Sequence, residues 1–311
     1  VKVSTDVTEK HQLDISAFAS NDFFELKLGL NDVDNDPTLA GKFFFKDQFN
    51  AQGIHLRSLF TDRLTSNLSL SRLYRFFSLG IGQGYFLKVE PIDYELREDV
   101  TYRLTPKHQL ESGLLFSTGP QRASGFFTRP PDEGDPNFDF TFEEKLRLDV
   151  SERFSRIEGY LQSRYTPFEF LSFALGLRLG YLNLTDQITV GPRGSFKLKI
   201  PSGSEISFAY GRYEQSPQPY QILPEVGNPG VKDSGAIHYI LEVERQLSPS
   251  TGIKVAGYYK NLEGLITRDQ QAIYLNQGKG FARGVEVFLR HRSGEKFFGW
   301  VSYAYAISKR R

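Results

Sequence analysis

Five histidines are the residues of this sequence best suited to acid–base chemistry or metal binding. They are His11, His55, His108, His238 and His291. None forms an HxxxH pair, and none stands beside a carboxylate at the spacing of a metal ligand. Cysteine is absent, which removes disulfides, thiolate nucleophiles and Cys-ligated zinc or iron–sulfur sites. We therefore expect no metal site and no cofactor, and interpret the histidines as surface or interior side chains.

A glycine-rich segment and the serines suggest two further kinds of chemistry. Residues 80–84 read GIGQG, but the residues that follow alternate as in a strand, whereas a phosphate-binding loop opens a helix. No GxSxG motif is present, and no Ser/His/Asp set can be assembled. Glu244 and His238 share one expected strand without an identifiable nucleophile. The sequence therefore predicts a protein that is not an enzyme.

Charged residues at alternating positions form the remaining set with chemical potential. The whole chain has 38 basic and 37 acidic residues, and this balance argues against a nucleic-acid partner. We take Arg178, Glu242 and Glu286 as candidate ligand contacts on a polar interior face, and Tyr213 and Tyr220 as candidates in loops. The full set expected on that face is Glu158, Arg164, Arg178, Lys197, Lys199, Glu242, Glu244, Glu286 and Arg290. Their mixed signs favour neither anions nor cations.

The segment 171–181 shows most clearly which element must position these side chains. Its odd positions are Leu171, Phe173, Leu175, Leu177, Leu179 and Tyr181, and its even positions are small or polar. A period of two places the apolar residues on one face of a strand, while a helix would scatter them around its circumference. The segment is about 11 residues long, the length that a tilted strand needs to cross a bilayer. It is predicted to be a membrane-spanning strand.

Similar runs recur along the chain, separated alternately by short turns and long polar stretches. The turns are expected at 8–10, 61–66, 105–107, 166–168, 201–203, 248–250 and 293–295, and the long stretches at 31–40, 119–144, 215–236 and 261–280. The sequence contains no run of about 18 apolar residues, so it predicts no transmembrane helix. Short turns on one side and long loops on the other are typical of outer-membrane barrels. We predict an all-β, antiparallel, up-and-down transmembrane barrel with about 14 strands in this chain.

Two features decide between this barrel and a soluble sheet with one face on a core. The apolar rows are long, and the opposite face carries small and charged residues, as a water-filled lumen requires. Aromatic residues near expected strand ends would form the girdles at the membrane interfaces. These are Tyr74, Phe76, Phe77, Tyr85, Tyr258 and Tyr259.

An ordered series of motifs in the second half of the chain carries a family resemblance. The motifs are RIEGYLQ at 156–162, LGLR at 175–178, GPR at 191–193, AYGRYEQSP at 209–217, NQGKGFARGVE at 276–286 and GWVSYAY at 299–305. In this order and spacing they resemble the barrel of TonB-dependent outer-membrane receptors. The match is good from about residue 147 onward, and residues 1–146 resemble generic barrel hairpins.

The resemblance implies a location, partners and a function. Residues 1–311 would be part of a barrel of about 22 strands that lies in the bacterial outer membrane and contacts its lipid. A plug domain and a segment that engages the TonB complex would lie outside this chain, and about four more strands would follow it. The protein would take up a scarce small-molecule or oligomeric nutrient, such as a siderophore, cobalamin or an oligosaccharide. The alternatives are a passive channel and a barrel-based surface enzyme or adhesin.

Overall fold

The computed structural model describes residues 1–29, 40–82, 84–128, 145–224, 227–268, 274–293 and 297–311. They form one antiparallel sheet in which the strands follow their order in the sequence, from β1 to β14. The strands are β1 (Lys2–Thr8), β2 (His11–Leu28), β3 (Gly41–Thr61), β4 (Leu64–Ile81), β5 (Tyr85–Thr105), β6 (His108–Thr128), β7 (Lys145–Phe168), β8 (Leu171–Leu182), β9 (Gln187–Ile200), β10 (Ser204–Gln215), β11 (Ser234–Ser248), β12 (Thr251–Arg268), β13 (Tyr274–Ser293) and β14 (Phe297–Arg310). The predicted fold class and strand number are confirmed.

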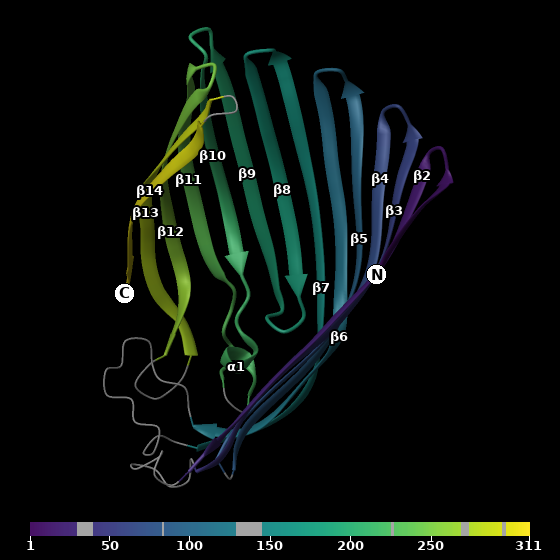
Figure 1. Ribbon diagram of the computed structural model, residues 1–311, viewed down its shortest axis with the longest axis vertical. Helices are drawn as coiled ribbons and strands as arrows, with labels where there is room; N and C mark the ends of the chain where they lie inside the picture. The colour runs from purple at the N-terminus through teal and green to yellow at the C-terminus, as the bar shows by residue number, and fades with distance from the viewer. Residues whose placement is uncertain (30–39, 83, 129–144, 225–226, 269–273, 294–296) are drawn as a thin grey trace.

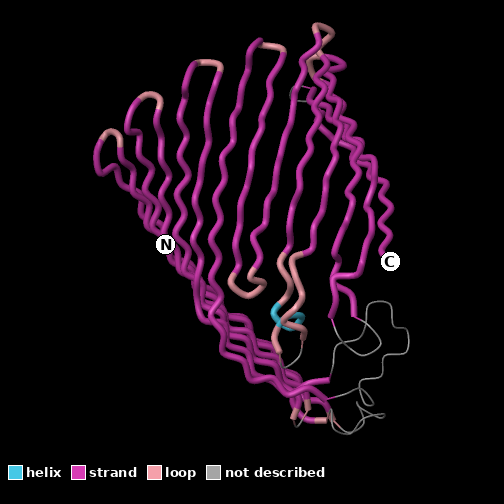
Figure 2. The backbone as a smooth tube through the Cα atoms, turned by 180° about the vertical axis from the view of Figure 1, so that it is seen from behind, coloured by secondary structure: helices cyan, strands magenta, loops and turns pink. Residues whose placement is uncertain are grey.

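The sheet curls into a trough, with the tight turns at one end and α1 (Pro219–Ile222) toward the other (Figure 1). Strands β3–β7 have 18 to 24 residues each, whereas β8 has 12. A strand needs only about 9–11 residues to cross a bilayer. The long strands therefore extend past the membrane thickness, and their far ends sweep across the open end of the trough (Figure 2). Among the described residues, no helix is long and apolar enough to cross a membrane.

Side chains that share a face can be followed from strand to strand, because residues paired across a ladder point to the same side. Tyr160 pairs with Arg178, and Arg178 pairs with Gly191. The same face, the inner face, continues through Arg193, Gly211 and His238. The opposite, outer face carries the row from Leu171 to Tyr181, in which Leu175 is 66% exposed. An exposed apolar row of this length is what a lipid-facing surface requires.

Apolar side chains at the loop-bearing end fix which face is concave. The connection between β10 and β11, residues 216–224 and 227–233, is here called the strap. Its Leu223 packs with Leu148 and Val150 of β7, against which Leu87 and Phe127 also lie. The strap emerges three strands away from β7, so this contact is possible only across the hollow side of the sheet. The strap therefore covers the inner face, and the inner face lines the lumen.

Three of the tight turns have a threonine hydroxyl that fixes the chain reversal. The backbone N–H groups of Lys10, Arg63 and Lys107 each donate to the threonine side chain two residues earlier, at 3.2 Å in every case. A local side-chain acceptor of this kind replaces the ladder bond lost at the turn. The predicted turns near 8–10, 61–66 and 105–107 are therefore confirmed.

Several predicted boundaries and orientations are wrong. The expected turn at 166–168 lies within β7, and the chain reverses at Glu169–Phe170. The stretches 119–144 and 261–280 were expected as loops, but β6 continues to Thr128, β12 to Arg268, and β13 begins at Tyr274. Of the predicted girdle, Phe77 and Tyr258 belong to the inner face, because they pair with Val89 and Gly284. The expected turn at 293–295 lies largely outside the described residues.

Candidate ligand site on the inner wall

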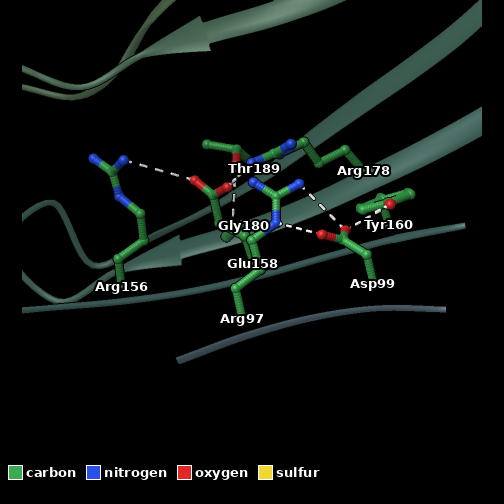
Figure 3. Close-up of polar contacts among 8 residues, drawn as sticks. All are labelled: Arg97, Asp99, Arg156, Glu158, Tyr160, Arg178, Gly180 and Thr189. Carbon is green, nitrogen blue, oxygen red and sulfur yellow. Dashed lines mark hydrogen bonds and ion pairs between the residues drawn. The ribbon is translucent and has the colours of Figure 1, made fainter. Parts of the chain in front are cut away.

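A group of ionic side chains on β5, β7 and β8 lines the middle of the inner wall (Figure 3). The Arg97 guanidinium donates to both oxygens of Asp99, with Nε–Oδ2 at 2.6 Å and Nη2–Oδ1 at 3.2 Å. The Tyr160 hydroxyl donates to the Asp99 Oδ1 atom at 2.7 Å. Both oxygens of the Asp99 carboxylate therefore accept hydrogen bonds. A half-buried charge needs such partners to be stable.

Glu158 holds the other half of this group. Arg178 donates to its Oε2 atom, and the Nη1 atom of Arg156 lies 3.7 Å from its Oε1 atom. The side chain of Glu158 is only 18% exposed, whereas that of Arg178 is 41% exposed. We call these residues the paired cluster; it comprises Arg97, Asp99, Arg156, Glu158, Tyr160 and Arg178. Each charged group in it has an opposite charge within ion-pair distance, although the three arginines outnumber the two carboxylates by one.

A glycine makes the paired cluster possible. Gly113 pairs with both Asp99 and Tyr160 on the two neighbouring strands. A Cβ atom at Gly113 would lie 2.3 Å from the Tyr160 ring and 2.6 Å from the Asp99 Oδ1 atom. The missing side chain leaves room for the tyrosine ring to lie across β6 and reach the carboxylate. The glycine on β6 therefore permits the hydrogen bond between Tyr160 on β7 and Asp99 on β5.

A different arrangement lies next to the paired cluster, on β9–β11. The Arg193 guanidinium lies over the Tyr213 ring, 4.7 Å from its centroid. The Tyr213 ring is in turn 4.5 Å from the His238 ring. The Nε atom of Arg193 is buried and has no hydrogen-bond partner within the described residues. We call Arg193, Tyr213 and His238 the cation–aromatic stack.

A second cation extends the stack toward β12. Lys260 pairs with His238 in the ladder, and its Nζ atom lies 5.3 Å from the centroid of the Tyr258 ring. Within the described residues, neither Arg193 nor Lys260 has a carboxylate within ion-pair distance. Cations against aromatic faces, with no carboxylate to neutralise them, can bind an anionic ligand that also presents flat or apolar groups.

The structure does not gather the five predicted ligand contacts into one site, although Glu242 and Glu286 both pair with Ala256. Arg178 is tied to Glu158, and Glu242 forms an ion pair with Lys254 at 2.5 Å. Glu286 lies on the inner face of β13, opposite Ala256 and Ala304. Tyr213, expected in a loop, belongs to β10 instead. Tyr220 is in α1, with its ring 6.1 Å from that of Tyr274. Their role in ligand binding stays a prediction.

Sequence reasoning missed Arg193, Lys260 and the partnership of Tyr213 with His238. Arg193 lies in the GPR motif at an odd position, as Lys197 and Lys199 do, so the period of two does place it on the inner face. Its lack of a partner depends on the register of three strands, which no local pattern encodes. Among the described residues, no group of three or more His, Asp or Glu side chains could hold a metal ion.

Comparison with known proteins identifies the family. The model of the family described as TonB dependent receptor-like, beta-barrel, matches residues 2–311. The chain belongs to this family. It is a protein of the bacterial outer membrane, as the lipid-facing row and the one-sided loops predict. No curated protein matches the sequence.

Solved structures with the same fold are distant in sequence. A mutant of the ferric enterobactin receptor PfeA from Pseudomonas aeruginosa is 13% identical, with a TM-score of 0.76, and the match covers 98% of this chain and 50% of that one. The iron transporter FrpB from Neisseria meningitidis is 10% identical, with a TM-score of 0.74, and the match covers 99% of this chain and 52% of that one. The outer membrane transporter YddB from Escherichia coli is 11% identical, with a TM-score of 0.64, and the match covers 99% of this chain and 54% of that one. The chain thus spans about half the length of these proteins.

Proposed function

We propose that the protein takes up an anionic metal chelate across the outer membrane with energy supplied through TonB. The family match supports uptake, because it covers residues 2–311. Two of the structures with the same fold are named for ferric enterobactin and for iron. A plug domain and a TonB-contacting segment are part of this proposal, as partners that lie outside the chain.

The cation–aromatic stack carries the choice of ligand. Arg193 has a buried donor without a partner and lies on the Tyr213 ring, so it is organised before any ligand arrives. Tyr213 is two residues from the end of β10 and His238 four residues from the start of β11, which places the stack close to the loop-bearing mouth. A chelate with negative charge and flat ligand groups would match both the guanidinium and the rings. An uncharged nutrient would leave the cations unmatched.

Binding is best tested with the protein expressed from its complete gene. A ferric catecholate, a ferric hydroxamate and cobalamin would be titrated by calorimetry. We expect the anionic catecholate to bind tightest and Arg193→Gln to weaken it about tenfold, because one charge-assisted contact is lost. Arg178→Gln is the matched control, since its guanidinium is committed to Glu158. Equal affinity for all three ligands would contradict the proposed ligand class.

Energy coupling needs a separate measurement in cells. Uptake of the labelled chelate would be compared in cells with and without TonB, at chelate concentrations near the dissociation constant. The proposal requires uptake to stop without TonB while binding to the cells remains. Uptake that continues, together with a large steady conductance of the purified protein in a planar bilayer, would instead establish a passive channel.

A further inference from the structure

A groove on the outer face of β10–β14 lies among aromatic side chains. It has a volume of about 710 Å³, within the range of small-molecule sites. The outer-face residues that line it are Phe208, Tyr239, Leu241, Gly257, Tyr259, Arg283, Val285, Tyr305 and Ile307. This groove opens toward the bilayer, away from the ligand stack on the inner face.

Gly257 forms the floor of the groove. It pairs with Leu241 on one side and Val285 on the other, both in the outer apolar rows. A Cβ atom at Gly257 would meet nothing within 4 Å, so the space above it is open. By contrast, a Cβ at the outer-face Gly159 would lie 3.2 Å from the Leu114 side chain. The hollow at Gly257 is therefore a gap in the lipid-facing surface that an apolar chain can fill.

Arg283 lies at the loop-side end of this floor. It pairs with Tyr259, two residues farther from the tight turn than Gly257. Its guanidinium lies 5.5 Å from the centroid of the Phe281 ring, and within the described residues it has no carboxylate partner. By contrast, the outward-facing Arg72 of β4 donates to Asn50 and Gln52. An unpaired arginine on a lipid-facing surface is costly unless an anion of the membrane pairs with it.

The level of Arg283 fits the interface rather than the bilayer centre. Tyr259 stacks on Phe281, with ring centroids 6.2 Å apart, and Tyr239 lies 5.4 Å from Tyr210. Aromatic girdles of this kind mark the depth of lipid headgroups in outer-membrane barrels. The loop-bearing end faces outward in such barrels. The phosphate groups of the outward-facing leaflet therefore lie at the depth of Arg283.

We propose that this groove is a specific site for one phosphate-bearing acyl lipid of the outward-facing leaflet. The acyl chain lies on Gly257 between the Tyr239 and Tyr305 rings, and the phosphate pairs with Arg283. The aromatic walls hold the chain by contact, and the guanidinium supplies a bidentate donor that suits phosphate. The site is independent of the nutrient, because the two faces of the sheet do not share side chains.

The test is native mass spectrometry of the protein expressed from its complete gene and purified in mild detergent. The probes are dipalmitoylphosphatidylglycerol and dipalmitoylglycerol, which differ by the phosphate-bearing headgroup. We expect the wild type to retain the phospholipid about tenfold more tightly than the diacylglycerol. Arg283→Gln should reduce phospholipid affinity about tenfold, to the level of the diacylglycerol. Gly257→Leu should weaken both lipids at least about tenfold, because it fills the floor.

Two controls keep the result specific. Ala17→Leu places the same leucine side chain on the outer face of β2, outside the groove, and Arg153→Gln removes an outer-face arginine of β7; neither should change lipid retention. Phospholipid retention by Gly257→Leu at the wild-type level would overturn the groove as the site. An unchanged phospholipid preference in Arg283→Gln would overturn phosphate recognition. A complex of twice the mass that Gly257→Leu abolishes would show that a second copy, not lipid, fills the groove.

Discussion

Tyr160 and Tyr213 lie over glycines of the same lumen wall, yet their surroundings differ in one respect. The Tyr160 hydroxyl donates to Asp99, and every charge near it has an opposite charge within reach. Tyr213 instead lies between Arg193 and His238, where the cation has no carboxylate and one donor is left over. The paired cluster satisfies itself, whereas the cation–aromatic stack requires something from outside. Tyrosine and arginine thus stabilise the lumen wall in the paired cluster, whereas in the cation–aromatic stack they are suited to binding a ligand.

The two regions are neighbours on the same wall. Arg193 pairs with Gly176, which is two residues from Arg178 along β8. The difference between the regions therefore lies in how their charges are paired.

The largest effect expected from this comparison is on stability, at the glycine beneath Tyr160. Gly113→Ala would place a Cβ atom 2.3 Å from the Tyr160 ring, which must move and give up its bond to Asp99. We expect the free energy of unfolding to fall by about 2–3 kcal/mol. Urea unfolding in lipid vesicles, followed by the gel mobility of the unheated barrel, measures it.

Gly211→Ala is the matched change in the other region. Its Cβ atom would lie 2.8 Å from the Tyr213 ring, whose hydroxyl has no hydrogen bond within the described residues, so the ring can swing away. The expected loss of stability is below about 1 kcal/mol, with a loss of ligand affinity instead. Equal destabilisation by the two variants would remove the distinction between the regions.

The second prediction concerns the ring of the stack. Tyr213→Ala removes the surface on which Arg193 lies, and we expect affinity for the anionic chelate to fall about tenfold with little change in stability. Tyr213→Phe keeps the ring and should bind as the wild type does. Calorimetry on the complete protein measures both variants. A loss of binding in the Phe variant would mean that the hydroxyl, not the ring, contacts the ligand.

The third prediction tests whether the paired cluster is stabilised as a unit. Glu158→Gln leaves Arg178 and Arg156 without their carboxylate and should cost about 1 kcal/mol of unfolding free energy, a modest value because both guanidinium groups are partly solvated. Ligand affinity should not change. A double-mutant cycle with Arg178→Gln should give a coupling energy of about 0.5–1 kcal/mol. A coupling energy of zero would show that this ion pair contributes nothing to the wall.

The strands were predictable from sequence because the bilayer enforces a period of two wherever one face meets lipid. The row from Leu171 to Tyr181 becomes β8 almost residue for residue. The prediction failed where strands leave the membrane: the extensions of β6 and β12, around Gln121 and Asn261, mix polar and apolar residues without a period of two, so no alternation marks them. The sequence pattern of a strand reflects the lipid or water around it. The backbone hydrogen bonds of the strand continue outside the membrane, where that pattern ends.

The candidate site was predictable only in part for a related reason. Alternation places Arg178 on the inner face, but it cannot show that Glu158 neutralises it. The contact between Tyr160 and Asp99 joins residues 61 positions apart in the sequence. Pairing depends on strand register, and register is set by turns and bulges along the whole sheet. The difference between a matched and an unmatched arginine is therefore a property of the fold.

The smallest effect concerns the strap, which begins beside the stack and packs on the β7 wall. Asp233 lies at its end; one carboxylate oxygen accepts from the Ser216 hydroxyl at 3.4 Å, and the other is buried without a partner within the described residues. Burial, followed by the negative charge of Glu214, raises the pKa of Asp233 above its ordinary value of 3.8. A strap packed on the wall, which we call closed, therefore binds a proton more readily than a strap detached from the wall would.

The sign of the pH effect follows from this raised pKa. Closure of the strap is most favourable below about pH 3.8, where Asp233 is protonated in both states, and it weakens as the pH rises through the raised pKa of the closed state. Asp233→Asn replaces the titrating carboxylate with a neutral amide and should hold the strap closed at neutral pH. Hydrogen exchange of residues 227–233 should show more protection in the variant at pH 7 and equal protection at pH 3. A difference in protection that is the same at both pH values would mean that Asp233 acts through the shape of its side chain and not through its charge.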